Sequence, residues 1–212
     1  MTKARAIPTI AFAIFLATIT ATGAQKSKRN AAADYFPLHV DDFWTYRNTS
    51  GDGEYSLKVL SEEKQTDGST RYLVEMLSGV KIDSLFSKTN GWVLMHGERY
   101  PEHEGMESKY EPAKQHLPNP LVAGTKWEWK GKDVTQTDLQ EMNKVIGFEK
   151  VTVPAGKFRA MKVVSQVTGA SPFTKTYWYA DGVGLVKSKT EGGKISYNWE
   201  LVDYSFKKKA EK

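Results

Sequence analysis

Hydrophobic and polar residues alternate with a period of two along most of this chain. The clearest run is 195–201, where Ile, Tyr, Trp and Leu alternate with Ser, Asn and Glu. The segments 54–60, 72–77 and 158–167 show the same alternation and are rich in aromatic and β-branched residues. A period of two is typical of half-buried β-strands, so the pattern predicts strands along most of the chain.

One of these runs changes parity near the C-terminus. After Leu201 the apolar positions continue at Val202, Tyr204 and Phe206, which fall on the opposite face of an ideal strand. An extra residue in one strand of a pair shifts the faces in this way. We therefore expect a β-bulge or a change of partner near Glu200–Val202.

Turn residues separate the alternating runs. Pro154-Ala155-Gly156, Asp181-Gly182 and Asn90-Gly91 each lie between two β-type segments, where proline presets φ and glycine supplies a positive φ. Further turns are expected at 48–53 and 66–68, and a last one at Gly192-Gly193. The pattern predicts ten to twelve strands joined to their neighbours, hence a one-domain, all-β antiparallel meander. Several strands carry large residues on both faces, which favours a strongly curved sheet of half-barrel type.

Two segments break the alternation. Gly97–Pro120 holds four of the eight prolines and many glutamates, so we expect a long functional loop or flap. Asp133–Asn143 is polar with scattered apolar residues, and the pattern leaves open a minor helix or a long exposed strand.

The N-terminus has the features of a secretory signal peptide. Lys3 and Arg5 precede the apolar run Ile7–Thr20, and Thr22-Gly23-Ala24 offers small residues for cleavage. The run is shorter than the roughly 20 residues that a spanning helix needs, although an uncleaved anchor is the alternative. We expect a signal peptide at 1–24, a basic polar linker at 25–33, one β domain at 34–206 and a basic tail at 207–212. The protein would then be exported to the periplasm or the exterior and would not be an integral membrane protein after cleavage.

The chain has no cysteine, so disulfides, thiolate nucleophiles and zinc–thiolate sites are excluded. Its net charge is +5, but between Ala31 and Phe206 there are 24 acidic and 21 basic residues. The positive charge therefore lies at the two ends, whereas nucleic-acid binding needs a basic stripe on the folded surface. We expect no nucleic-acid partner.

Three motifs resemble those of a broad group of uncharacterised exported bacterial β-proteins. They are Y-F-P-L-H-V-D-D-F-W-T-Y at 35–46, V-T-V-P-A-G-K-F at 151–158 and Y-W-Y-A-D-G-V-G-L-V-K at 177–187. The resemblance implies a curved antiparallel sheet similar in outline to the half-barrel of lipoprotein carriers, and it implies no catalytic residue. In this chain Asp41 stands where the group usually has glycine, so the turn before Phe43 is expected to differ.

Aromatic pairs are the candidate ligand-binding residues. Trp127 and Trp129 share one face of a predicted strand, as do Tyr177 and Tyr179. Such residues often pack in a core, but a concave aromatic surface can also take a lipid, an acyl chain or a sugar.

Histidines form the candidate metal site. His96, His103 and His116 lie near Glu98 and Glu104, and imidazole and carboxylate groups suit zinc. No H-E-x-x-H or comparable spacing is present, so surface histidines are the simpler interpretation. We expect no cofactor.

No nucleophile motif of the G-x-S-x-G type is present, so no catalytic residue is assigned. The sequence therefore predicts an exported, non-enzymatic envelope protein whose curved sheet binds a hydrophobic ligand, such as a lipid, or an envelope protein partner. One alternative is a structural or interaction domain whose own side chains fill the core. Another is a metal-assisted hydrolase that uses the three histidines.

Overall fold

The computed structural model describes residues 32–89, 91–133, 136–169, 171–192 and 195–206, which belong to one compact unit. The described residues form strands and turns and contain no helix, so the all-β prediction is confirmed. No helix in this part of the chain could cross a membrane.

Twelve strands are described. They are β1 (Phe43–Asn48), β2 (Glu54–Lys64), β3 (Thr70–Leu77), β4 (Lys81–Thr89), β5 (Trp92–Arg99), β6 (Glu107–Pro118), β7 (Lys126–Lys132), β8 (Asp138–Val153), β9 (Gly156–Thr168), β10 (Phe173–Ala180), β11 (Gly184–Gly192) and β12 (Ile195–Ser205).

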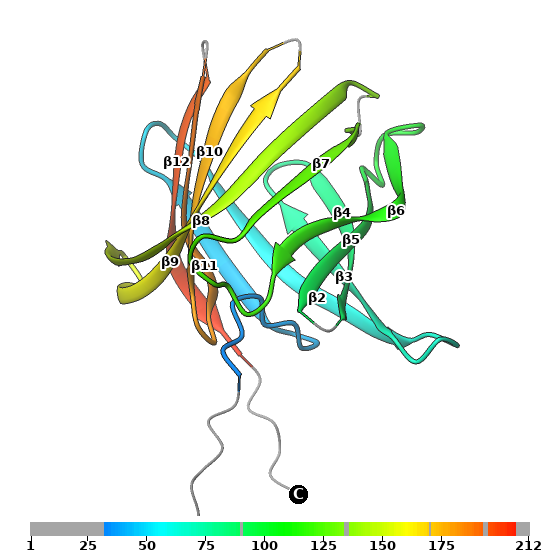
Figure 1. The fold of residues 1–212 in the computed structure, drawn as a ribbon, viewed down its shortest axis with the longest axis horizontal. Helices are drawn as coiled ribbons and strands as arrows, with labels where there is room; N and C mark the ends of the chain where they lie inside the picture. The colour runs from blue at the N-terminus through cyan, green and yellow to red at the C-terminus, as the bar shows by residue number, and fades with distance from the viewer. Residues whose placement is uncertain (1–31, 90, 134–135, 170, 193–194, 207–212) are drawn as a thin grey trace, which may run out of the picture. The chain divides into compact units, whose positions relative to one another are not determined.

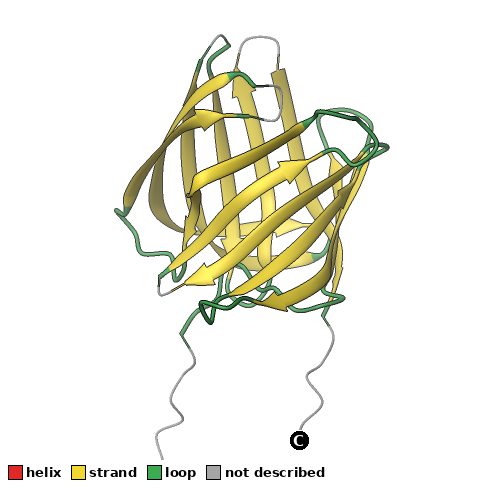
Figure 2. Ribbon diagram, turned by 90° about the vertical axis from the view of Figure 1, so that its right-hand side faces the viewer, coloured by secondary structure: helices red, strands yellow, loops and turns green. Residues whose placement is uncertain are grey.

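All twelve strands belong to one antiparallel sheet in the order β6-β5-β4-β3-β2-β1-β12-β11-β10-β9-β8-β7. Strands adjacent in sequence pair with each other, as a meander requires, except that β6 and β7 form the two edges. The first and last strands pair in the middle of the sheet instead. The sheet curves until its two edges approach each other and it is nearly closed into a barrel (Figures 1 and 2). The predicted strongly curved antiparallel sheet is therefore confirmed.

The predicted bulge lies in β12 where it pairs with β1. Thr45 is opposite Asp203, whereas the next residue, Tyr46, is opposite Leu201. Val202 is the extra residue, which explains why the apolar positions change parity there.

The turns predicted at 48–53, 66–68, 154–156 and 181–182 lie between strands as expected. The turns predicted at Asn90-Gly91 and Gly192-Gly193 include Asn90 and Gly193, which lie outside the described residues. Pro154 and Ala155 connect β8 to β9, and Asp181-Gly182 begins the turn between β10 and β11. Asp41 adopts a φ of 73°, a left-handed conformation that glycine adopts without strain. The turn before Phe43 thus keeps the backbone conformation that a glycine would take.

The expectation of a long loop at Gly97–Pro120 is wrong. This segment contains the end of β5, a short turn and the whole of β6. The prolines made this strand look like a loop. However, β6 is an edge strand, and an edge strand tolerates Pro112 and Pro118 because fewer of its backbone amides must donate to a neighbour. In Asp133–Asn143 the part from Asp138 onward is the start of β8, so the strand alternative applies there.

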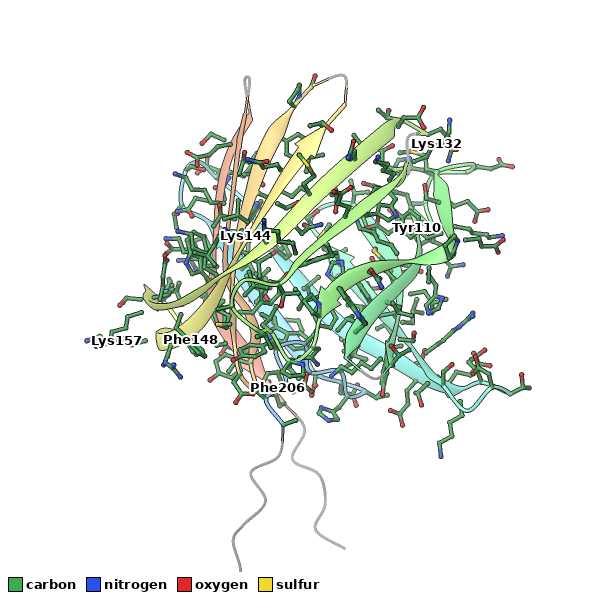
Figure 3. All side chains as sticks on the ribbon, in the orientation of Figure 1. Tyr110, Lys132, Lys144, Phe148, Lys157 and Phe206 are labelled. Atoms are coloured by element: carbon green, nitrogen blue, oxygen red, sulfur yellow. The ribbon has the colours of Figure 1, made fainter. Side chains whose placement is uncertain are left out.

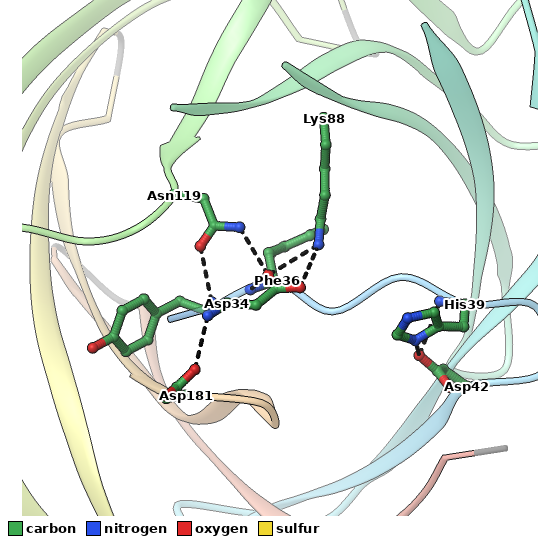
Figure 4. Close-up of polar contacts among 8 residues, drawn as sticks. Asp34, Phe36, His39, Asp42, Lys88, Asn119 and Asp181 are labelled. Carbon is green, nitrogen blue, oxygen red and sulfur yellow. Dashed lines mark hydrogen bonds and ion pairs between the residues drawn. The ribbon is translucent and has the colours of Figure 1, made fainter. Parts of the chain in front are cut away.

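A segment before β1 crosses one end of the curved sheet (Figure 4). The Asp34 carboxylate accepts hydrogen bonds from Lys88 Nζ at 2.7 and 2.9 Å and from Asn119 Nδ2 at 2.8 Å. The backbone N–H of Asp34 donates to Asp181 Oδ1 at 2.7 Å. These partners come from β4, from the residue after β6 and from the β10–β11 turn, so Asp34 connects distant parts of the sheet. Tyr35, which follows, is buried in the core.

The core lies inside the sheet. Its fully buried side chains come from strands around the whole sheet and include Tyr46, Val59, Val93, Val145 and Leu201. The predicted signal peptide at 1–24, most of the basic linker and the tail at 207–212 lie outside the described residues.

Candidate functional site

A cavity of about 400 Å³ lies inside the sheet and is lined by strands β4 to β10. Its size falls within the roughly 300–1,000 Å³ of small-molecule sites. The lining combines aromatic, aliphatic and charged side chains, including Phe86, Met95, Glu98, Tyr110, Lys114, His116, Trp127, Trp129, Glu141, Asn143, Val163, Ser165, Phe173, Lys175, Tyr177 and Tyr179. Figure 3 draws the side chains on the ribbon, with Tyr110 labelled on β6.

All four aromatic residues singled out in the sequence line this cavity. Trp127 and Trp129 lie two apart on β7, and Tyr177 and Tyr179 lie two apart on β10, so each pair points to the same face of its strand. The structure therefore brings the two pairs together from distant parts of the chain. Their role in binding a ligand stays a prediction.

Neighbouring rings fix the tryptophans in place. Trp127 packs edge-on against Trp92, with ring centroids 5.9 Å apart, and Trp129 packs edge-on against Tyr110 at 5.4 Å. Edge-to-face packing at these distances is favourable because the positive edge of one ring meets the negative face of the other.

An ion pair that sequence reasoning missed lies in the cavity wall. Lys114 Nζ on β6 is 2.9 Å from Glu141 Oε1 on β8, and each side chain is only 12% exposed. The same ammonium lies 4.2 Å from the centroid of the Trp129 ring, within the range of a cation–π contact. The cavity is thus aromatic and charged at once.

A second carboxylate in the cavity is also engaged. Tyr110 Oη donates to Glu98 Oε2 at 3.0 Å. Burial raises the pKa of the Tyr110 hydroxyl, and the negative charge of Glu98 raises it further, so the tyrosine stays protonated and continues to donate.

His116 is a neutral part of the wall. Its ring packs edge-on against Phe36 at 5.4 Å and Phe86 at 5.2 Å between centroids. Burial lowers the pKa of His116 to about 3, and the positive charges of Lys114 and Lys175 contribute to the shift. The imidazole is therefore uncharged at neutral pH.

The structure does not bring the three candidate histidines together. His96 Nε2 shares a hydrogen bond of 2.8 Å with Ser87 Oγ and lines a separate pocket of about 310 Å³. His103 lies in the exposed turn between β5 and β6 beside Tyr100. Only His116 lines the central cavity. Among the described residues no three His, Cys, Asp or Glu side chains are placed to hold a metal ion.

The missed charged residues carried a weak signal in the sequence. The inward positions of β6 fall on every second residue. They are filled by Ser108 and Tyr110 and then by Lys114 and His116. Because Lys114 is charged and prolines surround it, the segment looked exposed. The pairing of Lys114 with Glu141 depends on the closure of the sheet, which one sequence does not specify.

Two solved structures share this fold. One is a predicted exported protein with a YmcC-like fold from Bacteroides fragilis NCTC 9343, with a TM-score of 0.54, 14% identity and coverage of 82% of this chain and 100% of that chain. The other is a predicted lipoprotein from Parabacteroides distasonis ATCC 8503, with a TM-score of 0.52, 15% identity and coverage of 83% and 100%. At this identity the likeness concerns the fold alone.

Comparison with curated proteins finds no match. A family model described as DUF3108-like matches residues 86–197, from β4 into β12. This match spans more than half of the chain and includes the cavity-lining strands except the first part of β4. The chain therefore belongs to the DUF3108-like family.

Proposed function

We propose that this protein is an exported, non-enzymatic envelope protein that holds an amphiphilic ligand inside its curved sheet. The observation that carries the proposal is the convergence of Trp127, Trp129, Tyr177 and Tyr179 on one cavity of about 400 Å³. A ligand site is commonly a concave surface with aromatic walls and a few polar groups that fix orientation.

The lining favours an amphiphile over a purely apolar ligand. Aromatic rings offer surface to an acyl chain, whereas Lys114, Glu141 and Lys175 require a polar group nearby because buried charge is costly to leave unsolvated. An alkyl chain with a polar head satisfies both kinds of side chain. The ligand is therefore the hydrophobic molecule expected from the sequence, with a polar head in addition.

The carboxylates of Glu98 and Glu141 are better explained by ligand binding than by catalysis. Glycoside hydrolysis uses one carboxyl group as an acid and a second as a base or nucleophile. Here Glu141 forms an ion pair with Lys114, and Glu98 accepts a hydrogen bond from the Tyr110 hydroxyl. Both carboxylates therefore already have structural partners.

Export is supported by the signal-peptide features of residues 1–24 and agrees with the descriptions of the two structural relatives. One of them is described as an exported protein and the other as a lipoprotein. Periplasm and exterior are both compatible with these observations.

Mass spectrometry of organic extracts from the purified native protein tests the proposal directly. We expect a stoichiometric amphiphile in the extract and quenching of tryptophan fluorescence when dodecanoate is added to protein stripped of ligand. Replacing Tyr177 with leucine should weaken dodecanoate binding, whereas Trp178→Leu should not, because Trp178 is the next residue on β10 and does not line the cavity. An empty extract together with no response to dodecanoate or to a hydrophobic dye would instead support a structural domain with a self-filled core.

A further inference from the structure

We infer that a row of side chains across strands β7 to β10 binds the anionic head group of the ligand. The row consists of Trp127, Asn143, Ser165 and Lys175, and the expected head group is a carboxylate or a phosphate. This inference rests on the proposed function and specifies the chemical class of the ligand.

The register of the sheet places the four residues in line. Trp127 is directly opposite Asn143, Asn143 is opposite Ser165, and Ser165 is opposite Lys175. Directly opposite residues have Cβ atoms about 4.5–5.5 Å apart and point to the same face of the sheet. All four line the cavity, so the row forms a polar band across its wall.

Two hydrogen-bonding groups in this row are buried and unused. Trp127 is 7% exposed and Ser165 is 2% exposed. Within the described part of the chain, neither Trp127 Nε1 nor Ser165 Oγ has a hydrogen-bond partner. A buried polar group left without a partner is destabilising, so a ligand that satisfies these groups gains affinity.

The other two residues add charge and further donors. The Lys175 ammonium forms no salt bridge with the described residues and lies 5.3 Å from the centroid of the Phe173 ring. The amide of Asn143, 9% exposed, makes no side-chain hydrogen bond with the described residues. An indole N–H and an ammonium donate hydrogen bonds and never accept them.

The carboxylates that line the cavity already accept hydrogen bonds. Glu141 accepts from Lys114, Glu98 accepts from Tyr110, and Asp133 accepts from the backbone N–H of Thr137. The unused capacity along the row is therefore mainly that of donors, and Lys175 is the one charged residue in the row. Donors beside a positive charge select an anionic acceptor, as oxyanion sites in other proteins do.

The surroundings of the row suit the rest of the ligand. On one side of the row lie Trp129, Phe173 and, between them, Glu141 in its ion pair with Lys114. On the other side lie Val163 and Tyr177, which are directly paired. The apolar surface on the Val163–Tyr177 side lets an alkyl chain pack beside a bound head group.

Three ligands with the same chain and different heads test the inference on the full-length protein stripped of bound ligand. Dodecanoate, dodecyl phosphate and dodecanol are titrated by calorimetry and by tryptophan fluorescence. We expect the anions to bind at least about tenfold more tightly than dodecanol, because hydrogen bonds to charged groups are the strong ones. The stronger of the two anions identifies the head group as carboxylate or phosphate.

Three variants test whether the preference for anions comes from the row of Trp127, Asn143, Ser165 and Lys175. Lys175→Met should weaken binding of both anions by a larger factor than binding of dodecanol and so remove most of the preference for anions. Ser165→Ala should weaken anion binding severalfold without lowering the unfolding midpoint, because the hydroxyl has no partner to lose in the free protein. Lys144→Met is the matched control, since Lys144 follows Asn143 on β8 but is exposed and does not line the cavity.

The outcomes separate the two proposals. Equal affinity for dodecanol and both anions, or an anion preference that survives both Lys175→Met and Ser165→Ala, would overturn the anion row while leaving the binding function intact. Binding of none of the three ligands would overturn the proposed function itself. If Lys175→Met fails to fold, Ser165→Ala decides the question, because it removes only an unpartnered hydroxyl.

Discussion

The Lys114 ammonium and the Glu141 carboxylate, 2.9 Å apart, join β6 to β8 across the inner side of β7. Strands β6 and β7 are the two edges of the sheet, and no ladder of backbone hydrogen bonds connects them. Side-chain contacts join the edges, among them this ion pair, the packing of Tyr110 on Trp129 and the hydrogen bond from Ser108 Oγ to the Asp133 carbonyl. The closure of the sheet thus depends on side chains, and the ion pair is the contact among them that involves buried charge.

Replacing Glu141 with glutamine should destabilise the protein strongly. The substitution leaves the Lys114 ammonium without its partner in a site where both side chains are 12% exposed, and breaking such a pair costs about 3–5 kcal/mol. Urea unfolding followed by circular dichroism measures this loss. A double replacement, Lys114→Met with Glu141→Leu, should cost less than Glu141→Gln alone, because it leaves no unpaired charge.

The control for this prediction is a surface pair. Lys189 and Glu191 are 2.7 Å apart but 42% and 56% exposed, so Lys189→Met should change stability by less than about 1 kcal/mol. If Glu141→Gln proved as mild as Lys189→Met, the edges would not depend on the buried pair.

Replacing Gly131 with alanine should displace the Trp129 ring. A Cβ atom at position 131 would lie 2.4 Å from Trp129 Cζ2, which is too close for any real contact. The ring must then move away from its place beside Lys114. We expect a shift in tryptophan emission and weaker binding of dodecanoate. Gly51→Ala is the control, since its Cβ would meet only Asn48 Nδ2 at an ordinary 3.6 Å.

Replacing Asp34 with asparagine should loosen the segment that crosses the end of the sheet. Burial raises the pKa of Asp34, but hydrogen bonds from Lys88 and Asn119 and the charge of Lys88 outweigh it, so the pKa lies below its ordinary value of 3.8. The stabilisation is therefore fully present above pH 3.8 and is lost as the pH falls through the lower pKa of the folded state.

At pH 7 the Asp34→Asn variant should lose about 1–2 kcal/mol, which is less than the roughly 1.5–3 kcal/mol typical of a hydrogen bond to a charged group because the Asp34 side chain is 38% exposed. It should also show faster amide exchange at Tyr35. Asp203→Asn is a suitable control because Asp203 is exposed and accepts only from the neighbouring Tyr204 N–H. Unchanged exchange at Tyr35 in the Asp34 variant would contradict the prediction.

His116 should make the protein sensitive to mild acid. Its pKa is lowered to about 3 by burial, whereas in the unfolded chain it is near 6.5. Between these values the unfolded state takes up a proton that the folded state does not, so the free energy of unfolding falls as the pH decreases. Between pH 7 and pH 5 the wild type should lose about 2 kcal/mol more than His116→Gln. Parallel pH profiles for the two proteins would show that His116 titrates normally.

Much of the fold follows from local patterns in the sequence. Alternation and turn residues predict most of the strands, and the change of parity predicts the bulge at Val202. The pairs Trp127–Trp129 and Tyr177–Tyr179 were identifiable because residues two apart on a strand share a face. The sequence does not predict that the faces carrying these two pairs meet, because their meeting depends on how far the sheet curves.

The rest of the site was hidden for physical reasons. Proline and charge usually indicate exposure, so the strand carrying Tyr110, Lys114 and His116 was interpreted as a loop. Edge strands are an exception because their outer backbone groups need no partner within the sheet. Glu141 was missed because a buried carboxylate is recognised only by its partner, and its partner Lys114 lies on another strand. Glu98 was identified only as a neighbour of the histidines, whereas its partner is Tyr110.

The pairing of β1 with β12 also bears on how the chain folds. It joins the two most distant strands in sequence, with Phe43 opposite Ser205, while the other strand pairs join neighbours along the chain. A circular permutant that begins between β6 and β7, with Phe206 linked to Ala32, would turn every pairing into a simple hairpin. Because non-local pairing slows folding, such a rearranged chain would reach the same sheet faster than the natural order does.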